Sequence, residues 1–575
     1  MNKQTANLLE QHFDTAFAAP DGIAKLRELI LTLAMQGKLV EQDPNDPPAS
    51  ELLKEIEAER KRQIKAGGIK KQKALPTIDQ PDTSYVLPES WTWTRLGTIG
   101  NIFNGNSINV REKETKYAGA NGLPYIATKD VGYGLDALDY KNGIYIPESA
   151  EKFKIAHQGA VLICAEGGSA GKKCGITNMD ICFGNKLFAN ELFGGIPSKF
   201  ILYLYLSPIF RESFNAAMTG IIGGVSIAKF LELPVPLPPL PEQQRIVARV
   251  DQLMSRCDEL ERLRKEREEK RVAVHAAAVR QLLDAPDGTA WDFIQHHFGE
   301  LYAVKENVAE LRKTVLSLAV MGRLVPQDPN DPPASELLKE IEAEKQRLVK
   351  TGKIKRPKPL PPIKPEELPY ELPKGWEWVR LGEICSYIQR GKGPEYVDLS
   401  TRRVISQKCV RWYGLDLEPA RYIDPASLEK YEPTKFLRVG DLLWNSTGTG
   451  TIGRACLVPQ ALEGVEIVVD SHVTVVRPID VSPIFLWRWI QSPIVQNEIE
   501  GSASGTTNQI ELNPSTVINH LMPLPSLHEQ HRIVARIDQL MALCDTLDYQ
   551  IEAATAKRTE LLNALMANLS EEAAQ

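Results

Sequence analysis

Two glycine-rich stretches are the first parts of the sequence that could carry out chemistry. GTGTIG at 448–453 matches the GxGxxG pattern that holds dinucleotide phosphates, and a plausible strand at 441–445 precedes it. The segment that follows contains a proline and does not read as the helix that such a site requires. GGSAGKK at 167–173 is not a phosphate-binding P-loop, because Lys173 stands where that motif has serine or threonine. A nucleotide-dependent enzyme built on GTGTIG is therefore kept only as an alternative.

Motifs for methyl transfer and DNA cleavage are also only approximated. NDPPA at 45–49 and 330–334 is close to the Asp/Asn-Pro-Pro-aromatic motif of amino-methyltransferases, but alanine replaces the aromatic residue that would stack on the target base. PD at 81–82 with ETK at 114–116 fits the nuclease pattern PD…(D/E)xK only loosely. The nine histidines contain no HExxH motif and the eight cysteines no CxxC motif, which predicts neither a metal site nor a disulfide framework. We expect no catalytic site, metal or cofactor in this chain.

The composition is typical of a globular protein with several domains. At about 100–200 residues per domain, the 575 residues predict three or four folding units. A net charge of −6 does not by itself indicate a polyanion-binding protein, although clustering of charge matters more than the total. No apolar run approaches the ~20 residues of a membrane helix, and the first residues lack the apolar core of a signal peptide. A cytoplasmic protein is expected.

The sequence segments that would position any site occur twice along the chain. QDPNDPPASELLKEIEAE at 42–59 returns unchanged at 327–344, a displacement of 285 residues. WTWTRLG at 91–97 and WEWVRLG at 376–382 keep the same displacement. A period this long excludes solenoid repeats of about 20–50 residues and indicates duplication of a whole unit in a pseudo-two-fold arrangement.

A second pair of matching blocks closes the two copies. EQQRIVARVDQLMSRCDEL at 242–260 matches EQHRIVARIDQLMALCDTL at 529–547. Between the matching blocks, 98–232 and 383–520 are nearly unrelated, and both mix short β-like runs with a probable helix. Each copy is therefore interpreted as a shared frame that carries its own α/β insert of roughly 150 residues, an ordinary domain size.

The shared frames are predicted to be helical. Apolar residues of the closing blocks step by four and three, as on one stripe of a coiled coil. They are Ile246, Val250, Leu253, Cys257 and Leu260 in the first copy and Ile533, Ile537, Leu540, Cys544, Leu547 and Ile551 in the second. Gly37 and Gly322 are expected to end the opening helices, before a DPNDPP turn that resists helix. Ser50 and Ser335 are predicted to cap the helices that follow.

The frames resemble those of the specificity subunit of a type I restriction–modification system. The motifs that carry the resemblance are PLPPLPEQQRIV at 236–247, PLPSLHEQHRIV at 523–534 and LRELILTLAMQGKLV at 26–40. The resemblance implies a mixed α/β fold in which two target-recognition domains each read one half of a split DNA site. It also implies that long helices form an antiparallel coiled coil, which separates these domains and docks two methyltransferase subunits.

The same resemblance implies that the chemistry belongs to partner chains. The methyltransferase subunits would bind S-adenosylmethionine and methylate adenine, and restriction subunits would supply nuclease activity and use ATP and Mg²⁺. This chain would be non-catalytic. A coiled-coil scaffold without DNA specificity is the second alternative, besides the nucleotide-dependent enzyme.

The repeat and the resemblance together predict the domain boundaries. They are a helical frame region at 1–66, a linker at 67–90, recognition domain 1 at 91–241, a central helical frame region at 242–350, a linker at 351–375, recognition domain 2 at 376–528 and a frame helix at 529–575. The frame region at 1–66 departs from many members of the family and could pair with the last helix. A helix of ~30–40 residues spans roughly 45–60 Å, so its length is expected to set the spacing between DNA half-sites about one turn, ~34 Å, apart.

Residues that read DNA bases are expected on loops rich in glycine and amides, where short side chains can enter a groove. In recognition domain 1 the candidates are Asn104, Asn106, Lys129, Ser169, Lys172, Lys173, Asn185, Lys186 and Ser226. In recognition domain 2 they are Arg390, Lys392, Lys408, Arg411, Ser446, Thr447, Thr449, Arg454, His472, Thr507 and Asn508. Arginine and asparagine are favoured, because each can form two hydrogen bonds to a guanine or adenine edge.

Overall fold

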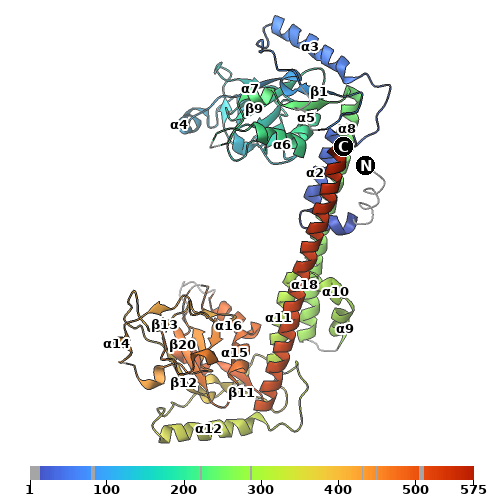
Figure 1. Ribbon diagram of the computed structural model, residues 1–575. Helices are drawn as coiled ribbons and strands as arrows, with labels where there is room; N and C mark the ends of the chain where they lie inside the picture. Colours follow the sequence, from blue (N-terminus) through green and yellow to red (C-terminus); the bar gives the residue numbers. More distant parts are fainter. Residues whose placement is uncertain are drawn as a thin grey trace. The chain divides into compact units, whose positions relative to one another are not determined.

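The chain forms two compact units that each combine helices and sheets (Figure 1). The computed structural model describes residues 13–78, 85–220, 223–284, 288–429, 431–448, 450–503 and 511–574. Unit 1 contains Met1–Arg267 and Ala553–Gln575, and unit 2 contains Glu268–Glu552. Each unit holds an opening pair of helices, two main sheets and parts of two long helices, so the mixed α/β fold with a duplicated plan is confirmed.

The opening helices lie at nearly the same positions in the two copies of the repeated sequence, although the first helix of unit 2 begins two residues earlier than that of unit 1. They are α2 (Gly22–Met35) and α3 (Ala49–Lys65) in unit 1, and α11 (Lys305–Val320) and α12 (Ala334–Lys350) in unit 2. Gly37 and Gly322 follow α2 and α11 with φ of +68° and +70°, a conformation that favours glycine. A Cβ atom at either position would also collide with the ring of Pro88 or Pro373. The predicted glycine stops are therefore fixed by both conformation and packing.

The predicted serine caps are wrong. Helix α3 begins at Ala49 and α12 at Ala334, so Ser50 and Ser335 lie inside the first turn and make no capping hydrogen bond there. The backbone N–H of Ala49 instead donates to the carbonyl oxygen of Ser90 at 2.9 Å, and that of Ala334 donates to Gly375 at 2.9 Å. A helix end needs partners for its first N–H groups, and here a distant loop supplies one of them.

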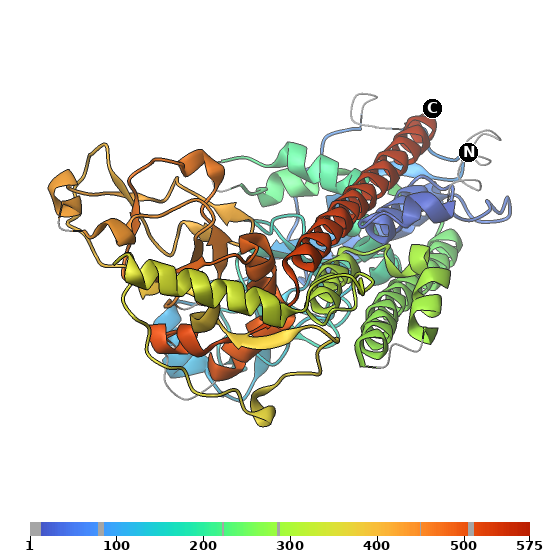
Figure 2. The same ribbon diagram turned by 90° about the horizontal axis from the view of Figure 1, so that it is seen from below.

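A two-stranded sheet closes the base of each recognition domain. Strand β1 (Thr92–Arg95) pairs antiparallel with β10 (Pro234–Leu237), and β11 (Glu377–Arg380) pairs in the same way with β21 (Leu521–Leu524). These strands join the start of each recognition domain to its end. The long helices α8 (Leu240–Asp284) and α18 (Leu527–Ala574) follow directly after β10 and β21, and Figure 2 shows α18 as one uninterrupted helix.

The long helices bury most of the predicted apolar stripe. Ile246, Val250 and Cys257 are buried in unit 1, and their counterparts Ile533, Ile537 and Cys544 are buried in unit 2. Leu260 departs from the prediction, because it is 46% exposed. Both helices continue from one unit into the other, since α8 ends in unit 2 and α18 ends in unit 1.

In each unit, the C-terminal part of one long helix packs against other residues of the same unit. In unit 1, Leu562 and Leu565 of α18 are buried against Ala16, Phe17 and Ala19. In unit 2, the corresponding cluster joins α8 to α10 (Phe298–Leu301), which follows α9 (Thr289–His296); its buried members are Ala278, Ile294, Leu301, Tyr302, Val308 and Cys544. The duplicated frames thus have equivalent cores.

A buried glutamate at the start of each long helix ties the frame together. The indole N–H of Trp91 donates to Glu242 Oε2 at 2.9 Å, and the side-chain amide of Gln42 donates to Oε1. Burial raises the pKa of Glu242, whereas these hydrogen bonds act in the opposite direction. Glu529 repeats the arrangement in unit 2, where Trp376 donates at 2.9 Å. The residues joined here lie about 150 and 200 positions apart in both copies, so the same long-range hydrogen bonds hold the repeated blocks together in each unit.

The recognition domains are built on equivalent four-stranded antiparallel sheets. In unit 1 the strand order is β2-β9-β6-β7, with bounds Gly100–Asn104, Leu187–Leu192, Val161–Cys164 and Cys174–Ile176. In unit 2 the order is β12-β20-β17-β18, with bounds Cys385–Arg390, Val473–Pro478, Leu442–Asn445 and Ala455–Leu457. Every residue of β6 and of β17 is buried. The two sheets share one topology although the sequences that form them are nearly unrelated.

A second sheet in each recognition domain contains one parallel pair. In unit 1 the order is β4-β3-β8-β5, with β3 parallel to β8 and bounds Tyr145–Ile146, Leu123–Ile126, Ile181–Phe183 and Ile155–Ala156. In unit 2 the order is β16-β13-β19, with β13 parallel to β19 and bounds Arg421–Tyr422, Arg403–Ile405 and Val468–Val469. A hairpin of β14 (Val410–Arg411) and β15 (Gly414–Leu415) is present in unit 2. The covering helices are α5 (Ser198–Leu206), α6 (Pro208–Ala217), α7 (Ile227–Leu231), α15 (Pro483–Gln491), α16 (Pro493–Ala503) and α17 (Pro514–Asn519).

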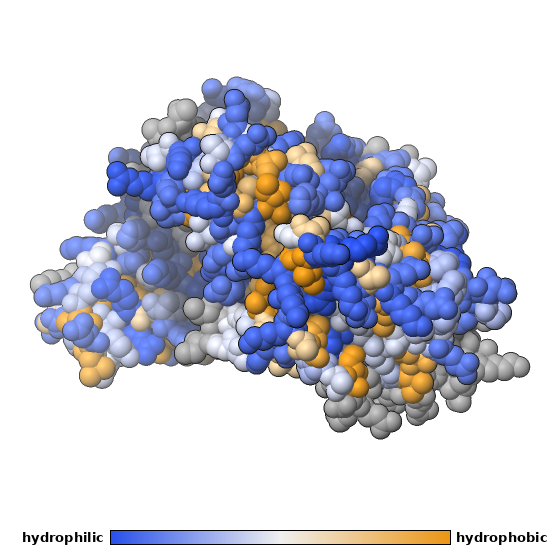
Figure 3. All heavy atoms as spheres, turned by 90° about the horizontal axis from the view of Figure 1, so that it is seen from above, coloured by the Kyte–Doolittle hydropathy of each residue, from blue (hydrophilic) through white to orange (hydrophobic). Residues whose placement is uncertain are grey.

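The surface is mainly polar. Hydrophilic side chains cover most of the face in Figure 3, and hydrophobic ones form small separate patches. Within the described ranges, no helix is long and apolar enough to cross a membrane. The same ranges contain no cluster of three or more histidine, cysteine, aspartate or glutamate side chains placed to hold a metal ion.

Candidate nucleic-acid interface

One edge of each four-stranded sheet carries most of the predicted DNA-binding residues. In unit 1, β2 ends at Asn104, which pairs with Phe188 near the start of β9. In unit 2, β12 ends at Arg390, which pairs with Thr474 near the start of β20. Because all neighbouring strands are antiparallel, the loops that leave β2 and β6 emerge beside those that enter β9 and β7. The same holds for β12, β17, β20 and β18.

The sheet edge in unit 1 forms a cleft of about 700 Å³ that brings three predicted residues together. Asn104, Asn185 and Ser226 line this cleft, although they are far apart in the sequence. Sequence reasoning missed two further polar residues there, Glu166 and Thr219. The signal for Glu166 was its position, because it follows a fully buried strand and opens a glycine-rich loop. Amide, hydroxyl and carboxylate groups can together match the donors and acceptors of a base edge.

Lys154, which was not predicted, fixes the orientation of the Asn104 amide. Its ammonium group donates to the carbonyl oxygen of Asn104 at 2.8 Å and to Oδ1 at 2.9 Å. Burial lowers the pKa of Lys154, and the nearby charge of Lys70 acts in the same direction. Asn106 has both ends of its amide engaged, since Nδ2 donates to Lys152 O at 3.1 Å and Oδ1 accepts from the Lys154 N–H at 2.9 Å. Asn106 therefore acts chiefly as a brace between two loops.

The loops beside the cleft add charge. Lys186 is exposed and lies 3.9 Å from Glu166, so the two charges partly compensate each other. Ser226 has a structural task as well, because its hydroxyl accepts the Lys229 N–H at 3.3 Å and caps α7. Asn185 is exposed next to Lys186. Among the predicted residues here, Asn104 and Asn185 present the amide groups that suit adenine.

Unit 1 carries further predicted lysines, one of which contacts Tyr133. The Lys173 ammonium lies 4.9 Å from the centre of the Tyr133 ring, a cation–π contact. Lys129 and Lys172 are exposed, and the carbonyl oxygen of Ser169 accepts the Lys172 N–H at 3.1 Å. Exposed lysines of this kind suit contacts to phosphate rather than to bases. Tyr133 is 56% exposed and was not predicted.

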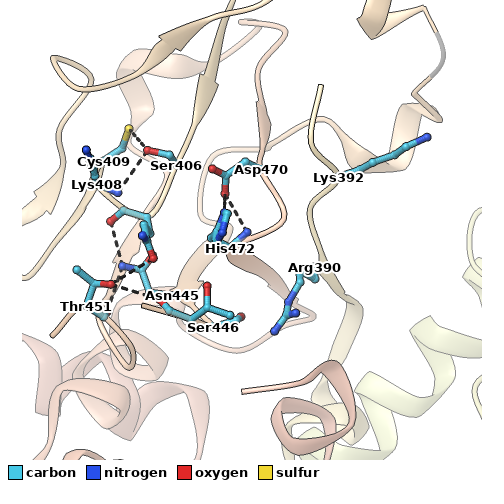
Figure 4. A network of polar contacts seen from close by, with 12 residues as sticks. Arg390, Lys392, Ser406, Lys408, Cys409, Asn445, Ser446, Thr451, Asp470 and His472 are labelled. Atoms are coloured by element: carbon cyan, nitrogen blue, oxygen red, sulfur yellow. Dashed lines mark hydrogen bonds and ion pairs between the residues drawn. The ribbon is translucent and has the colours of Figure 1, made fainter. Parts of the chain in front are cut away.

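In unit 2, Arg390 and His472 lie at the equivalent edge (Figure 4). Arg390 forms an ion pair with Glu511 and donates to the carbonyl oxygen of Leu512 at 3.1 Å. The backbone N–H of His472 donates to Asp470 Oδ1 at 2.9 Å, and its ring lies 3.4 Å from the same carboxylate. The His472 side chain remains half exposed, which leaves the ring accessible.

Burial removes Ser446 from the candidates for direct base contact. Ser446 is 1% exposed, and its hydroxyl is hydrogen-bonded to the hydroxyl of Thr474 on the neighbouring strand. Strand β17 ends at Asn445, and the side chain of Ser446 directly after it is still buried. Thr447 is half-buried, and its Oγ1 has no hydrogen-bond partner among the described residues. It remains a candidate for contact with a ligand.

Two arginines of unit 2 are held by local contacts. Arg454 donates to the carbonyl oxygen of Gly450 at 2.8 Å, which folds it onto its own loop. Arg411 lies 3.6 Å from Asp416 within the β14–β15 hairpin. Tyr413 follows in the same hairpin, is 79% exposed and was missed by sequence reasoning. An exposed aromatic ring beside an arginine can stack on or pack against a base.

The other candidates of unit 2 are exposed or lie outside the described residues. Lys392 and Lys408 are exposed. Thr449, Thr507 and Asn508 fall outside the described part of the chain.

The GTGTIG stretch does not form a dinucleotide site. It lies in the loop between β17 and β18, which pair antiparallel, and β18 follows it at Ala455. A dinucleotide site requires a helix at that point, with its N-terminus directed at the phosphates. The nucleotide-dependent alternative therefore loses its structural basis.

Similarity to known proteins identifies the family. A family model described as the type I restriction modification DNA specificity domain matches residues 88–269 and 373–554. The chain belongs to the type I specificity-subunit family. It is 37% identical over 574 residues to the EcoAI specificity subunit of Escherichia coli, covering 94% of this chain and 92% of that protein. It is 31% identical to the EcoEI specificity subunit of Escherichia coli, covering 95% and 93% respectively.

A solved structure of the same kind is similar over a large share of the chain. The HsdS subunit from Thermoanaerobacter tengcongensis aligns with a TM-score of 0.41 and 19% identity, covering 84% of this chain and 97% of that one. Membership of the specificity-subunit family gives this chain the role of a DNA specificity component. It is a non-catalytic part of a restriction–modification system.

Proposed function

We propose that the two recognition domains read two different DNA words that form one split, asymmetric site. The observation that supports this most directly is the equivalence of the two sheet edges. Asn104 and Arg390 occupy the same place in sheets of the same topology, but asparagine suits adenine and arginine suits guanine. Two equivalent supports with different side chains would give a bipartite site without two-fold symmetry.

We further propose that the frames dock two copies of one methyltransferase subunit. The duplicated cores and the equivalent buried glutamates Glu242 and Glu529 give the two frames the same internal structure, on which equivalent docking surfaces could be built. The methyltransferase subunits would bind S-adenosylmethionine, and restriction subunits would join through them with ATP and Mg²⁺. The length of the long helices would set the number of base pairs between the two words. Such a complex would act on DNA in the cytoplasm.

Mapping of methylated adenines tests the proposed function. The chain and its methyltransferase subunit would be expressed in a host without other adenine methylation, and modified positions would be sequenced. We expect two short words at a fixed separation. Exchanging residues 98–232 for those of a relative should change one word and leave the other, whereas modification of a single uninterrupted word would contradict the proposal. Methyl transfer by the purified chain alone would contradict the assignment of the chemistry to its partners.

A further inference from the structure

A groove in the frame of unit 2 has a lining that the other unit repeats. The groove lies between the DPNDPP turn after α11 and the first turns of α18, and has a volume of about 580 Å³. Val325, Asp328 and Pro329 form one side, and Arg532, Arg536 and Gln539 form the other. Among all lining residues, only Pro326 has a different counterpart in unit 1, where Glu41 stands.

The hydrogen bonds of this lining are repeated as well. Arg536 Nη1 donates to Gln539 Oε1 at 3.0 Å, and in unit 1 Arg249 Nη1 donates to Gln252 Oε1 at 2.6 Å. Arg249, Gln252, Arg536 and Gln539 are all exposed. Identical exposed side chains in identical contacts thus occur at both frames.

Packing within the chain does not explain why the groove residues are identical in the two units. On the same long helices, exposed Arg256 of unit 1 corresponds to exposed Leu543 of unit 2, so exposed positions outside the groove have diverged. On α2 the ion pair Lys25–Glu28 is replaced on α11 by a pair with its charges reversed, Glu310–Lys313. Surface positions outside the groove therefore differ between the two copies, as the small contribution of surface ion pairs to stability allows.

The identity extends to an exposed stripe on the next helix. Glu51, Lys54, Glu55 and Ala58 recur at positions spaced by three and four on one side of α3, opposite buried Leu52 and Ile56. Their counterparts on α12 are the same residues and carry the same spacing: Glu336, Lys339, Glu340 and Ala343. Both copies thus keep one surface that their own folds do not require.

We infer that this groove and the equivalent residues of unit 1 bind the same segment of the methyltransferase subunit, once in each half of the chain. This inference rests on the proposed function and names the docking surface for it. A single partner chain that presents one segment would select the same lining twice. Gln539 takes one of the five N–H donors of Arg536, so the exposed guanidinium can pair with a carboxylate of the partner. An apolar side chain next to that carboxylate would pack on Val325 and Pro329, and on Val40 and Pro44 in unit 1.

Charge reversal at the two arginines tests the inference on the full chain. Arg249→Glu, Arg536→Glu and the double variant would be mixed with the methyltransferase subunit, and the mass of each complex measured by light scattering and native mass spectrometry. We expect two partner copies on the unchanged chain, one on each single variant and none on the double variant. Loss of a buried interfacial charge contact predicts affinity at least ~30-fold weaker at the altered groove. Arg256→Glu is the matched control on the same helix and should retain two copies.

The outcomes separate this inference from the proposed function. If the double variant still binds two partner copies with unchanged affinity, the groove is not the docking surface, although the proposed function stands. If the unchanged chain binds none, the proposed function itself fails. Arg249→Ala and Arg536→Ala guard against misfolding, because they remove the charge without adding one, and circular dichroism would verify their folding. Equal weakening by Arg256→Glu would also overturn the inference, since it would indicate a general effect of charge.

Discussion

The ion pair between Arg477 and Asp441 offers a sharp test of how the loops of recognition domain 2 are supported. Arg477 Nε donates to Asp441 Oδ1 at 2.7 Å and Nη2 donates to Oδ2 at 2.7 Å. The side chains are 11% and 1% exposed. Asp441 directly precedes β17, and Arg477 lies on β20, so the pair joins the two strands whose other ends lead to Thr447 and His472.

Arg477→Met should destabilise unit 2 strongly. Methionine keeps much of the length and apolar stem, but it leaves the Asp441 carboxylate buried with only local donors such as the Arg438 N–H. Removing one partner of a buried pair costs about 3–5 kcal/mol. For a unit of this size, 1 kcal/mol corresponds to roughly 2–4 °C, so the melting transition of unit 2 should fall by roughly 6–20 °C.

Differential scanning calorimetry of the full chain would measure this shift. Arg402→Met is the control, because Arg402 pairs with Glu466 at 2.8 Å but the two side chains are 38% and 61% exposed. An exposed pair contributes about 0–1 kcal/mol, so this variant should melt almost unchanged. The reasoning would be refuted if Arg477→Met melted within 2 °C of the control variant. In methylation mapping, Arg477→Met should impair reading of the second DNA word at temperatures near its lowered transition.

Other expected outcomes concern titration and DNA contacts. Burial lowers the pKa of His520 to about 4. The stability that depends on neutral His520 is therefore fully present above the unfolded-state pKa of about 6.5 and is lost as the pH falls toward 4. His520→Phe should remove this pH dependence from urea unfolding curves. A hydrogen bond to Glu191 raises the pKa of His157. The stability that this hydrogen bond contributes is therefore fully present below pH ~6.5 and is lost as the pH rises through the pKa of His157 in the folded protein. NMR titration of His157 and unfolding curves of His157→Gln would detect this change. Lys173→Ala should weaken binding of all DNA sequences by the complex and lower the slope of log affinity against log salt by about 1. Asn104→Ala should relax discrimination roughly 5- to 150-fold (about 1–3 kcal/mol) at one position of the first DNA word, measured by methylation of base-substituted sites.

The frames could be predicted because their constraints are local or repeated. Gly37 and Gly322 end their helices for reasons that sequence reveals, since the left-handed conformation favours glycine. The buried stripe at Ile246, Val250 and Cys257 follows from its spacing alone. Leu260 fits the same spacing but is exposed, because helical periodicity does not show where the packing partner ends.

The wrong cap assignments have a tertiary cause. Serine at position 50 suits an N-cap, but the loop that carries Ser90 reaches the helix end and satisfies the N–H of Ala49. The N-cap is therefore Pro48, two residues before the predicted Ser50, and the helix starts at Ala49. This hydrogen bond joins positions about 40 residues apart, so the local sequence around Ser50 does not predict it.

The candidate interface was only partly accessible from the sequence for a similar reason. Loop composition identified Asn104 and Asn185, but it could not show that they share a cleft with Glu166. It also included Ser446, which the register of β17 against β20 buries beside Thr474. Whether a residue near a strand end faces the core or the solvent depends on the exact register, because side chains alternate along a strand.

Equivalent sheet edges explain how one frame can carry two unrelated readers. Strand order is held by backbone hydrogen bonds, which do not depend on the side chains at the strand ends. Asn104 and Arg390 can therefore differ while β2 and β12 keep their place beside β9 and β20. The frame would have no such freedom under the proposed function, because a partner that docks twice would have to meet the same surface in both copies. Divergence at the sheet edges and identity in the frames are what the proposed function would require: each edge would contact a different DNA word, and both frames would contact the same partner protein.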